Sequence, residues 1–236
     1  MIVRFIVPCR NIEKNVPKLL SSLLEQTSDN WRCVIIDDMS DDDTQMTILN
    51  YLTENSIDSK ISFHHNYVRK HALKNVIELS RPHQDSNDVI AVIDGDDQLC
   101  NPNTVKLLLD AYSAGNDIVW TAHKWDINGM NISKSMPANV NPYQWPWSTS
   151  HLRTFRASLL KDVSDENFKD SKGEWFKRGY DQALMLPLLS LTTKRKYIND
   201  VCYLYNINSV SMPKRDWTEV DQLQTINFVR ARGFVK

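Results

Sequence analysis

Two short apolar runs lead directly into clusters of aspartate, and this pattern constrains the fold more than any other feature of the chain. Residues 33–36 precede Asp37 and Asp38, and residues 89–93 precede the tetrapeptide Asp-Gly-Asp-Asp at 94–97. Both runs are rich in β-branched residues and apolar without alternation, which is typical of parallel strands covered by helices on both faces. Ligands of open α/β sheets bind beyond the carboxyl ends of such strands. The pattern therefore predicts a site for a cation and a polyanion such as a nucleotide diphosphate.

Strand-like and helical stretches alternate up to about residue 123. The expected strands are residues 2–7, 32–37, 61–65, 89–94 and 117–121. The expected helices, with apolar residues at 3.6-residue spacing, lie at about 16–24, 44–54, 73–77 and 105–112. Alternation of this kind predicts an α/β fold with a doubly wound, mainly parallel sheet flanked by helices.

The second half of the chain is less regular. Residues 126–150 are polar and rich in asparagine, with three prolines, and we interpret them as a functional loop or lid. Helical patterns return at about 158–163, 180–191 and 217–232, with a strand-like run at 197–205. The length of 236 residues fits a single domain.

Composition excludes several classes of partner. Lys and Arg number 28 against 29 Asp and Glu, a net charge of -1, so no overall field would attract nucleic acid or an anionic membrane. The four cysteines form no C-x-x-C pair, which favours reduced thiols in a cytoplasmic protein. No apolar run reaches the length of about 18 residues that a membrane span needs. Residues 1–8 are interpreted as a first strand and not as a signal peptide.

The acidic tetrapeptide suits a hard metal ion. Asp94 and Asp96 are expected to lie on one side of an extended chain end, and Asp97 adds a third carboxylate at the turn. Oxygen ligands at this density suit Mg²⁺ or Mn²⁺, which would also bind substrate phosphate. A turn whose aspartates accept backbone N–H bonds is the alternative interpretation. The acidic run at 37–43 likewise fits the capped first turn of a helix.

Several segments resemble glycosyltransferase family 2, in the order and spacing of that family. They are residues 5–11, 20–27, 34–44, the pair Lys74-Asn75, 93–97 at the position of the DxD motif, Gly179-Tyr180-Asp181, and the closing stretch 205–211. Each motif alone is weak, and the combination is specific. The resemblance implies one GT-A glycosyltransferase domain over residues 1–236 that inverts the anomeric centre. Residues 1–123 would form its nucleotide-sugar-binding half and 124–236 its acceptor-binding half.

The resemblance also implies roles for individual residues, a UDP-sugar donor and a Mn²⁺ or Mg²⁺ cofactor. The residues expected to bind the nucleotide sugar are Pro8, Arg10, Asn11, Asp38, Lys74, Asp94 and Asp96. Among them, Asp38 would accept the uracil N–H and Asp94 would hold the ribose or a metal-bound water. Asp96 with Asp97 would hold the metal ion. Asp181 would be the catalytic base that takes the proton of the acceptor hydroxyl.

The acceptor would be a saccharide or glycoconjugate, with polysaccharide biosynthesis as the expected role. Trp145, Trp147 and His151 are candidates to line its site, although tryptophans also pack in cores and histidines are often structural. Arg10 stands where the family often has an aromatic residue, and Asn208 replaces a frequent histidine. The Gln-x-x-Arg-Trp signature of processive synthases is absent.

Two other functions use the same carboxylates. A metal-dependent nucleotidyl or phosphoryl transferase would need a Gly-rich phosphate loop, which Pro8-Cys9-Arg10-Asn11 is not. A sugar-nucleotide-binding protein without catalysis is the other alternative, and the presence of Asp181 argues against it. The sequence leaves open whether the protein forms a homo-oligomer.

Overall fold

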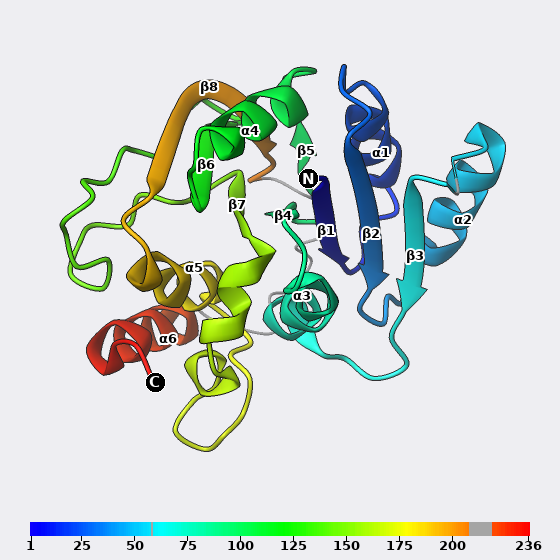
Figure 1. The fold of residues 1–236 in the computed structure, drawn as a ribbon. Coiled ribbons are helices and arrows are strands. Elements are labelled where there is room, and N and C mark those ends of the chain that lie inside the picture. The colour runs from blue at the N-terminus through cyan, green and yellow to red at the C-terminus, as the bar shows by residue number, and fades with distance from the viewer. Residues whose placement is uncertain (58, 208–218) are drawn as a thin grey trace.

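One mixed sheet runs through the molecule. The computed structural model describes residues 1–57, 59–207 and 219–236, and its eight strands lie in the order β3-β2-β1-β4-β7-β6-β8-β5 (Figure 1). The strands are β1 (Val3–Cys9), β2 (Trp31–Asp37), β3 (Ile61–His65), β4 (Val89–Val92), β5 (Gln98–Leu99), β6 (Ile118–Trp125), β7 (Arg153–Arg156) and β8 (Arg195–Tyr205). The α-helices are α1 (Val16–Leu24), α2 (Thr44–Asn55), α3 (His71–Ser80), α4 (Thr104–Ser113), α5 (Tyr180–Leu191) and α6 (Glu219–Arg232). Short 3₁₀ helices are η1 (Arg81–His83), η2 (Ala157–Asp162) and η3 (Asp165–Phe168).

The amino-terminal strands are parallel and in register. In β1, Ile6 is paired with Val92 of β4, and Cys9 is paired with Asp37 at the end of β2. The carboxyl ends of β1, β2 and β4 therefore lie side by side, and both acidic clusters emerge at this edge of the sheet. The expected arrangement of a mostly parallel sheet flanked by helices is confirmed.

The sequence pattern does not predict β5 and β7. The short strand β7 is antiparallel to both of its neighbours, β4 and β6, and β5 is antiparallel to β8. The sequence of β7, Arg-Thr-Phe-Arg, has charged ends and a single large apolar residue, so it does not indicate a central strand. The two residues of β5 are too few to show any periodicity. The helical pattern expected at 158–163 is a short 3₁₀ helix, η2.

Apolar side chains fill both sides of the sheet. Phe5 of β1 belongs to one buried cluster with Leu20 of α1, while Ile6 belongs to a second cluster with Val76 of α3. Successive strand residues point to opposite faces, so this alternation shows that helices cover both faces of β1. Because both faces of β1 are covered, its residues are apolar without alternation.

The expected loop between β6 and β7 contains no helix or strand over residues 126–150. It is nevertheless anchored. The Arg230 guanidinium of α6 donates hydrogen bonds of 2.9 Å to the carbonyl oxygens of both Tyr143 and Trp145. The indole N–H of Trp120 on β6 donates to the Lys134 carbonyl at 2.9 Å. Because α6 also packs beside α5 (Figure 1), the loop is connected to the helix that carries the predicted catalytic base.

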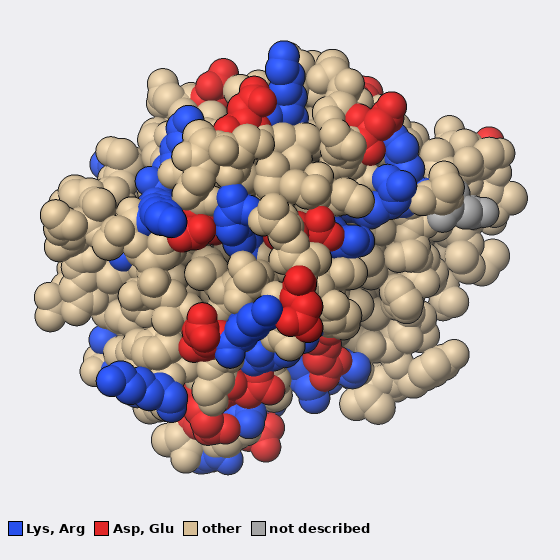
Figure 2. Space-filling view, in the orientation of Figure 1, with Lys and Arg blue, Asp and Glu red and all other residues tan. Residues whose placement is uncertain are grey.

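Charge is distributed without a single dominant sign. Figure 2 shows Lys and Arg interspersed with Asp and Glu over the face in view, as expected from a net charge of -1. Among the described residues, no helix has both the length and the apolar character needed to cross a membrane.

The central position of β7 can be tested by truncating Phe155, whose side chain is fully buried. We expect Phe155→Ala to lower the free energy of unfolding by about 3–5 kcal/mol, because it leaves a cavity beside the sheet. Met46→Ala on α2 is the control, since Met46 is 56% exposed, and it should change stability by less than about 0.5 kcal/mol. Urea unfolding measures both. Equal effects would contradict a central, buried β7.

Candidate active site

The acidic tetrapeptide forms a turn between β4 and β5, pressed against β1. The N–H of Asp97 donates to the Asp94 carbonyl at 2.9 Å, and the N–H of Gly95 donates to the Pro8 carbonyl at 3.2 Å. A Cβ atom added at Gly95 would collide with the Cβ of Cys9. Only glycine permits this approach, which holds the acidic turn directly beside the end of β1.

Asp94 is paired with a buried arginine. The Nη2 atom of Arg153 on β7 lies 2.9 and 3.1 Å from the two carboxylate oxygens of Asp94, and 2.9 Å from the hydroxyl of Tyr180. The Tyr180 hydroxyl also donates a hydrogen bond to Asp94. Burial alone would lower the pKa of Arg153, but Asp94 and the other acidic groups around the guanidinium together outweigh burial and raise it, so the guanidinium stays charged. This three-residue network joins the acidic turn, the sheet and the start of α5.

Asp97 lies almost completely inside the protein, at 1% exposure. Its oxygens accept hydrogen bonds from the Tyr203 hydroxyl at 2.7 Å and from the Asn206 N–H at 2.8 Å. Burial first, and then the charges of Asp96 and Asp94, raise the pKa of Asp97 well above its usual range. Burial next to two other carboxylates therefore disfavours the charged form of Asp97.

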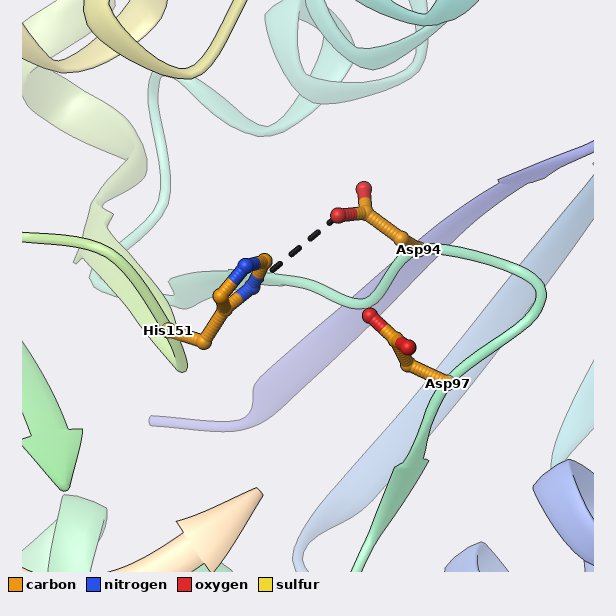
Figure 3. A group of neighbouring side chains, drawn as sticks. All are labelled: Asp94, Asp97 and His151. Carbon is orange, nitrogen blue, oxygen red and sulfur yellow. Dashed lines mark ion pairs between the residues drawn. The ribbon is translucent and has the colours of Figure 1, made fainter. Parts of the chain in front are cut away.

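His151, just before β7, points toward the same carboxylates (Figure 3). Its Nδ1 atom is buried, lies 3.9 Å from Asp94 Oδ2 and has no hydrogen-bond partner. Burial, followed by the charge of Arg153 and the neighbouring His123, lowers the pKa of His151 well below its usual value, so the imidazole is neutral. One ligand atom each of Asp94, Asp97 and His151 lie within 4.8 Å of one another. Carboxylate oxygen and neutral imidazole nitrogen are ligands that Mn²⁺ accepts, so these residues fit a divalent ion.

This group differs in part from the predicted pair of metal ligands. Asp97 belongs to it, and so do Asp94 and His151, which are expected from the sequence to bind the donor and the acceptor, respectively. Asp96 lies in the same turn, and its backbone carbonyl accepts a hydrogen bond of 2.5 Å from the side-chain amide of Asn206. Spacing along the chain could not assign His151 to the acidic turn, because a long stretch of chain separates the two. Only the pairing of β4 with β7 brings them together.

Asp181 is the second residue of α5, directly after the Tyr180 that binds Asp94. The predicted start of this helix at residue 180 is confirmed. Burial raises the pKa of the half-buried Asp181, and the Arg153 charge opposes that rise. A carboxylate with a raised pKa is a better proton acceptor than an ordinary surface acid. Asp181 directly follows Tyr180, whose hydroxyl is bonded to Arg153, so the first turn of α5 brings Asp181 next to a member of this network.

Asp38 is 5% exposed and is the centre of a dense set of hydrogen bonds. Its Oδ1 accepts from the Asn66 side-chain amide at 2.9 Å and from the Lys70 N–H at 2.8 Å, and its Oδ2 accepts from the His71 N–H at 2.8 Å. Burial raises the pKa of Asp38, but these donors outweigh burial and lower it. Asp38 therefore anchors the start of α3 to the end of β2, whatever else it binds.

Pro8, Arg10 and Asn11 lie where β1 ends and continues into the following turn. Pro8 is the next-to-last residue of β1. Arg10 donates from Nε to the Met39 carbonyl at 3.1 Å, and the Asn11 side-chain oxygen accepts from the N–H of Asp41 at 3.0 Å. The turn after β1 is thus connected to the turn after β2, as expected for residues that share one binding edge.

Lys74 is directed toward a neighbour on its own helix. Its ammonium on α3 is 3.8 Å from a carboxylate oxygen of Glu78, one turn further along. This contact does not join Lys74 to the acidic turn, so a role in binding the nucleotide sugar stays a prediction. Residues 208–211, the end of the predicted closing motif, lie outside the described residues.

Trp145 and Trp147 are half-buried at the end of the long loop. Both pack against the apolar cluster that contains Phe155. Part of each indole therefore packs against the core, which is one of the two roles that the sequence allows for these tryptophans. Their role in binding an acceptor stays a prediction.

The comparison with protein families decides the classification of this chain. The model described as "Glycosyl transferase family 2" matches residues 5–168. The chain belongs to glycosyltransferase family 2. The family predicted from the sequence is confirmed, and with it the assignment to the glycosyltransferase enzymes. No curated protein sequence gives a significant match to the chain.

Several solved structures share the fold of this family 2 domain. TarS 1-349 of S. aureus in complex with UDP superimposes with a TM-score of 0.67 at 20% identity, covering 96% of this chain and 70% of that one. The complex of the same fragment with UDP-GlcNAc gives a TM-score of 0.70 at 17% identity, and the match covers 97% of this chain and 65% of the TarS fragment. The mannosyltransferase PcManGT of Pyrobaculum calidifontis, in complex with GDP-Man and Mn²⁺, gives a TM-score of 0.62 at 16% identity. This match covers 98% of this chain and 63% of PcManGT. The chain covers only 42% of the length of a longer TarS structure. The similarity to these glycosyltransferase structures confirms the predicted GT-A fold.

The hydrogen bonds of Asp38 predict a large effect on stability. Asp38→Ala leaves two backbone N–H groups and one amide without their acceptor, so we expect the free energy of unfolding to fall by about 2–4 kcal/mol at neutral pH. Because the pKa of Asp38 is lowered in the folded state, this loss should be complete above the unfolded-state pKa of about 4. It should shrink as the pH falls through the lower, folded-state pKa.

Chemical unfolding across this pH range measures the effect. Asp110→Ala, at an exposed position of α4, is the control. Its stability should stay within about 0.5 kcal/mol of the parent protein. Equal stability of the two variants would contradict the anchoring role of Asp38.

Proposed function

We propose that this glycosyltransferase moves a sugar from a UDP-sugar to a hydroxyl of a saccharide or glycoconjugate acceptor, with inversion at the anomeric carbon and with a divalent metal ion. The observation that carries the proposal is the Asp94–Arg153–Tyr180 network, which joins the acidic turn to the helix of Asp181. The TarS fragment that shares the fold was solved with UDP and with UDP-GlcNAc, which supports a uridine donor.

The donor would bind at the carboxyl ends of β1, β2 and β4, in the amino-terminal half. Pro8, Arg10 and Asn11 would line the base pocket beside Asp38. The Oδ2 atom of Asp38 accepts one hydrogen bond, from the His71 N–H, and so retains one lone pair for a further partner. Lys74 would reach the phosphates by exchanging its carboxylate partner on α3 for the diphosphate.

The acceptor would bind on the side formed by residues 124–236. Trp145 and Trp147 are candidates to stack on a sugar ring, because they are half-buried and keep part of their surface exposed. The loop that carries them is held by α6, which packs beside α5. An acceptor on this loop would therefore lie near the helix that begins with Asp181.

The acidic turn would hold Mn²⁺ or Mg²⁺, with Asp96 and Asp97 as the ligands expected from the family. When bound, such an ion neutralises the negative charge that develops on the departing diphosphate. The PcManGT structure, which shares the fold, contains Mn²⁺ with its nucleotide sugar, and this supports a metal role here. Asp97 gives a physical reason to expect a cation in this turn, because burial beside two other carboxylates disfavours its negative charge.

Asp181 would remove the proton of the acceptor hydroxyl as that oxygen attacks the anomeric carbon. The attack comes from the face opposite the diphosphate, so a single displacement inverts the centre. Arg153 supports this role, because its charge opposes full protonation of Asp181 while burial keeps the carboxylate basic.

A donor screen tests the proposal directly. The protein is incubated with Mn²⁺ and a panel of UDP-sugars and GDP-mannose, and release of the nucleoside diphosphate is measured with and without candidate saccharide acceptors. Acceptor-dependent release of UDP is the expected result. Release of pyrophosphate would favour a nucleotidyl transferase, and binding without turnover of any donor would favour a sugar-nucleotide-binding protein.

Metal dependence gives a second measurement. We expect a chelator to weaken UDP binding in calorimetry by more than about tenfold, because an ion held by the acidic turn would attract the negatively charged diphosphate. Asp96→Asn should lose most of the dependence on Mn²⁺, whereas Asp110→Asn on α4 should behave as the parent. If UDP binds equally well in chelator, the metal bridge is wrong.

Replacement of Asp181 separates chemistry from binding. Asp181→Asn keeps the size of the side chain but cannot accept a proton, so transfer to the acceptor should fall by at least about a hundredfold with UDP-sugar affinity nearly unchanged. Single-turnover transfer and equilibrium binding measure the two effects, with Asp110→Asn as the matched control. Near-parental transfer would remove Asp181 from the mechanism.

A further inference from the structure

The packing around His151 leaves one of its ring nitrogens without a hydrogen-bond partner. The residue is 7% exposed, and its buried Nδ1 atom has no hydrogen-bond partner. A buried polar atom without a partner is costly, and native proteins rarely leave one. In Figure 3 the imidazole points toward the carboxylates of Asp94 and Asp97. The distance of 3.9 Å from Nδ1 to Asp94 Oδ2 is too long for a hydrogen bond.

The orientation of this ring is fixed by aromatic neighbours on β8. Tyr203 stacks on it with ring centroids 4.6 Å apart and planes inclined by 14°, and Tyr205 stacks at 4.9 Å and 23°. His123 of β6 meets it edge-on at 5.4 Å. Rings packed in this way restrict rotation, so the nitrogen is held toward the acidic turn before any ligand arrives.

The two carboxylates beside His151 retain room for a ligand. The Oδ2 atom of Asp97 accepts a hydrogen bond from Tyr203, and the Oδ2 atom of Asp94 accepts one from Arg153. A carboxylate oxygen has two lone pairs, so each of these atoms can take a further partner. Neighbouring ligand atoms of one octahedral ion lie about 3 Å apart and opposite ones about 4.2 Å apart. The Nδ1 of His151 and the Oδ2 of Asp94, at 3.9 Å, lie between these two spacings. The ligand atoms of the whole group lie within 4.8 Å of one another and would move closer together around a bound ion.

We propose that His151 is a direct ligand of the divalent ion, together with Asp97 and Asp94. This inference rests on the metal dependence of the proposed function and adds a ligand to those expected from the sequence. It also replaces the acceptor-lining role expected for His151. A nitrogen ligand suits Mn²⁺ better than Mg²⁺, which prefers oxygen, so the site should select Mn²⁺.

The inference predicts a spectroscopic signature on the parent protein. Electron spin echo envelope modulation of bound Mn²⁺, first alone and then with UDP, should show coupling to an imidazole ¹⁴N nucleus. His151→Gln should lose that coupling and should weaken Mn²⁺ binding by about tenfold or more, since even indirect contributors to a metal site can cost this much. His151→Asn is the second variant if the first fails to fold. His64→Gln, at an exposed position of β3, is the matched control and should keep both the coupling and the affinity.

The outcomes separate this inference from the proposed function. Mn²⁺ bound without ¹⁴N coupling in the parent protein would overturn the histidine ligand while leaving a carboxylate metal site intact. Coupling that persists in either variant of His151 would assign the nitrogen to another residue and would also overturn it. Failure to bind Mn²⁺ at all, with or without UDP, would overturn both the ligand and the metal dependence. Coupling in a protein that binds no UDP would support His151 as a ligand and count against the UDP-sugar donor.

Discussion

The buried ion pair of Arg153 and Asp94 is the interaction on which the rest of the site depends. An arginine at 2% exposure is stable only when its charge is paired at close range. Asp94 supplies the opposite charge from the acidic turn, and the Tyr180 hydroxyl supplies a further acceptor from α5. Removal of either member of the ion pair would leave an uncompensated charge inside the protein. The same pair therefore fixes the acidic turn relative to β7 and to the start of α5, which carries the predicted base.

The parallel part of the sheet and its acidic edge could be predicted from the sequence, because there local pattern and tertiary structure agree. The runs before Asp37 and Asp94 are apolar without alternation since both of their faces are covered. The expected helix at 180–191 agrees with α5 as observed. Family motifs then point to Asp97 and Asp181 as members of one site, although their roles, like that of the predicted metal ligand Asp96, stay predictions.

The rest could not be predicted because it depends on contacts between distant segments. Arg153 looks like a surface residue in the sequence, and only the antiparallel pairing of β7 with β4 places it beside Asp94. His151 meets the acidic turn for the same reason. Asp38 resembles a ligand-binding acid, and nothing in its neighbourhood along the chain shows that the start of α3 would donate two N–H groups to it. In each case the two groups that meet come from segments far apart in the chain.

Tyr180 and Asp181 are consecutive residues of one helix, and Tyr180 is bonded to the acidic turn through Asp94. Neighbouring residues of an α-helix differ by 1.5 Å in rise and by a fixed rotation about the axis. The rigid geometry of a single helical step therefore sets the separation between the turn that would hold the diphosphate and the carboxylate that would accept the proton. A sugar placed between them would meet two groups whose spacing does not depend on any flexible loop. A bulkier transferred group would have to be accommodated by a different rotamer of Asp181 or by a shift of the first turn of α5, so this turn would bear on the size of sugar that fits.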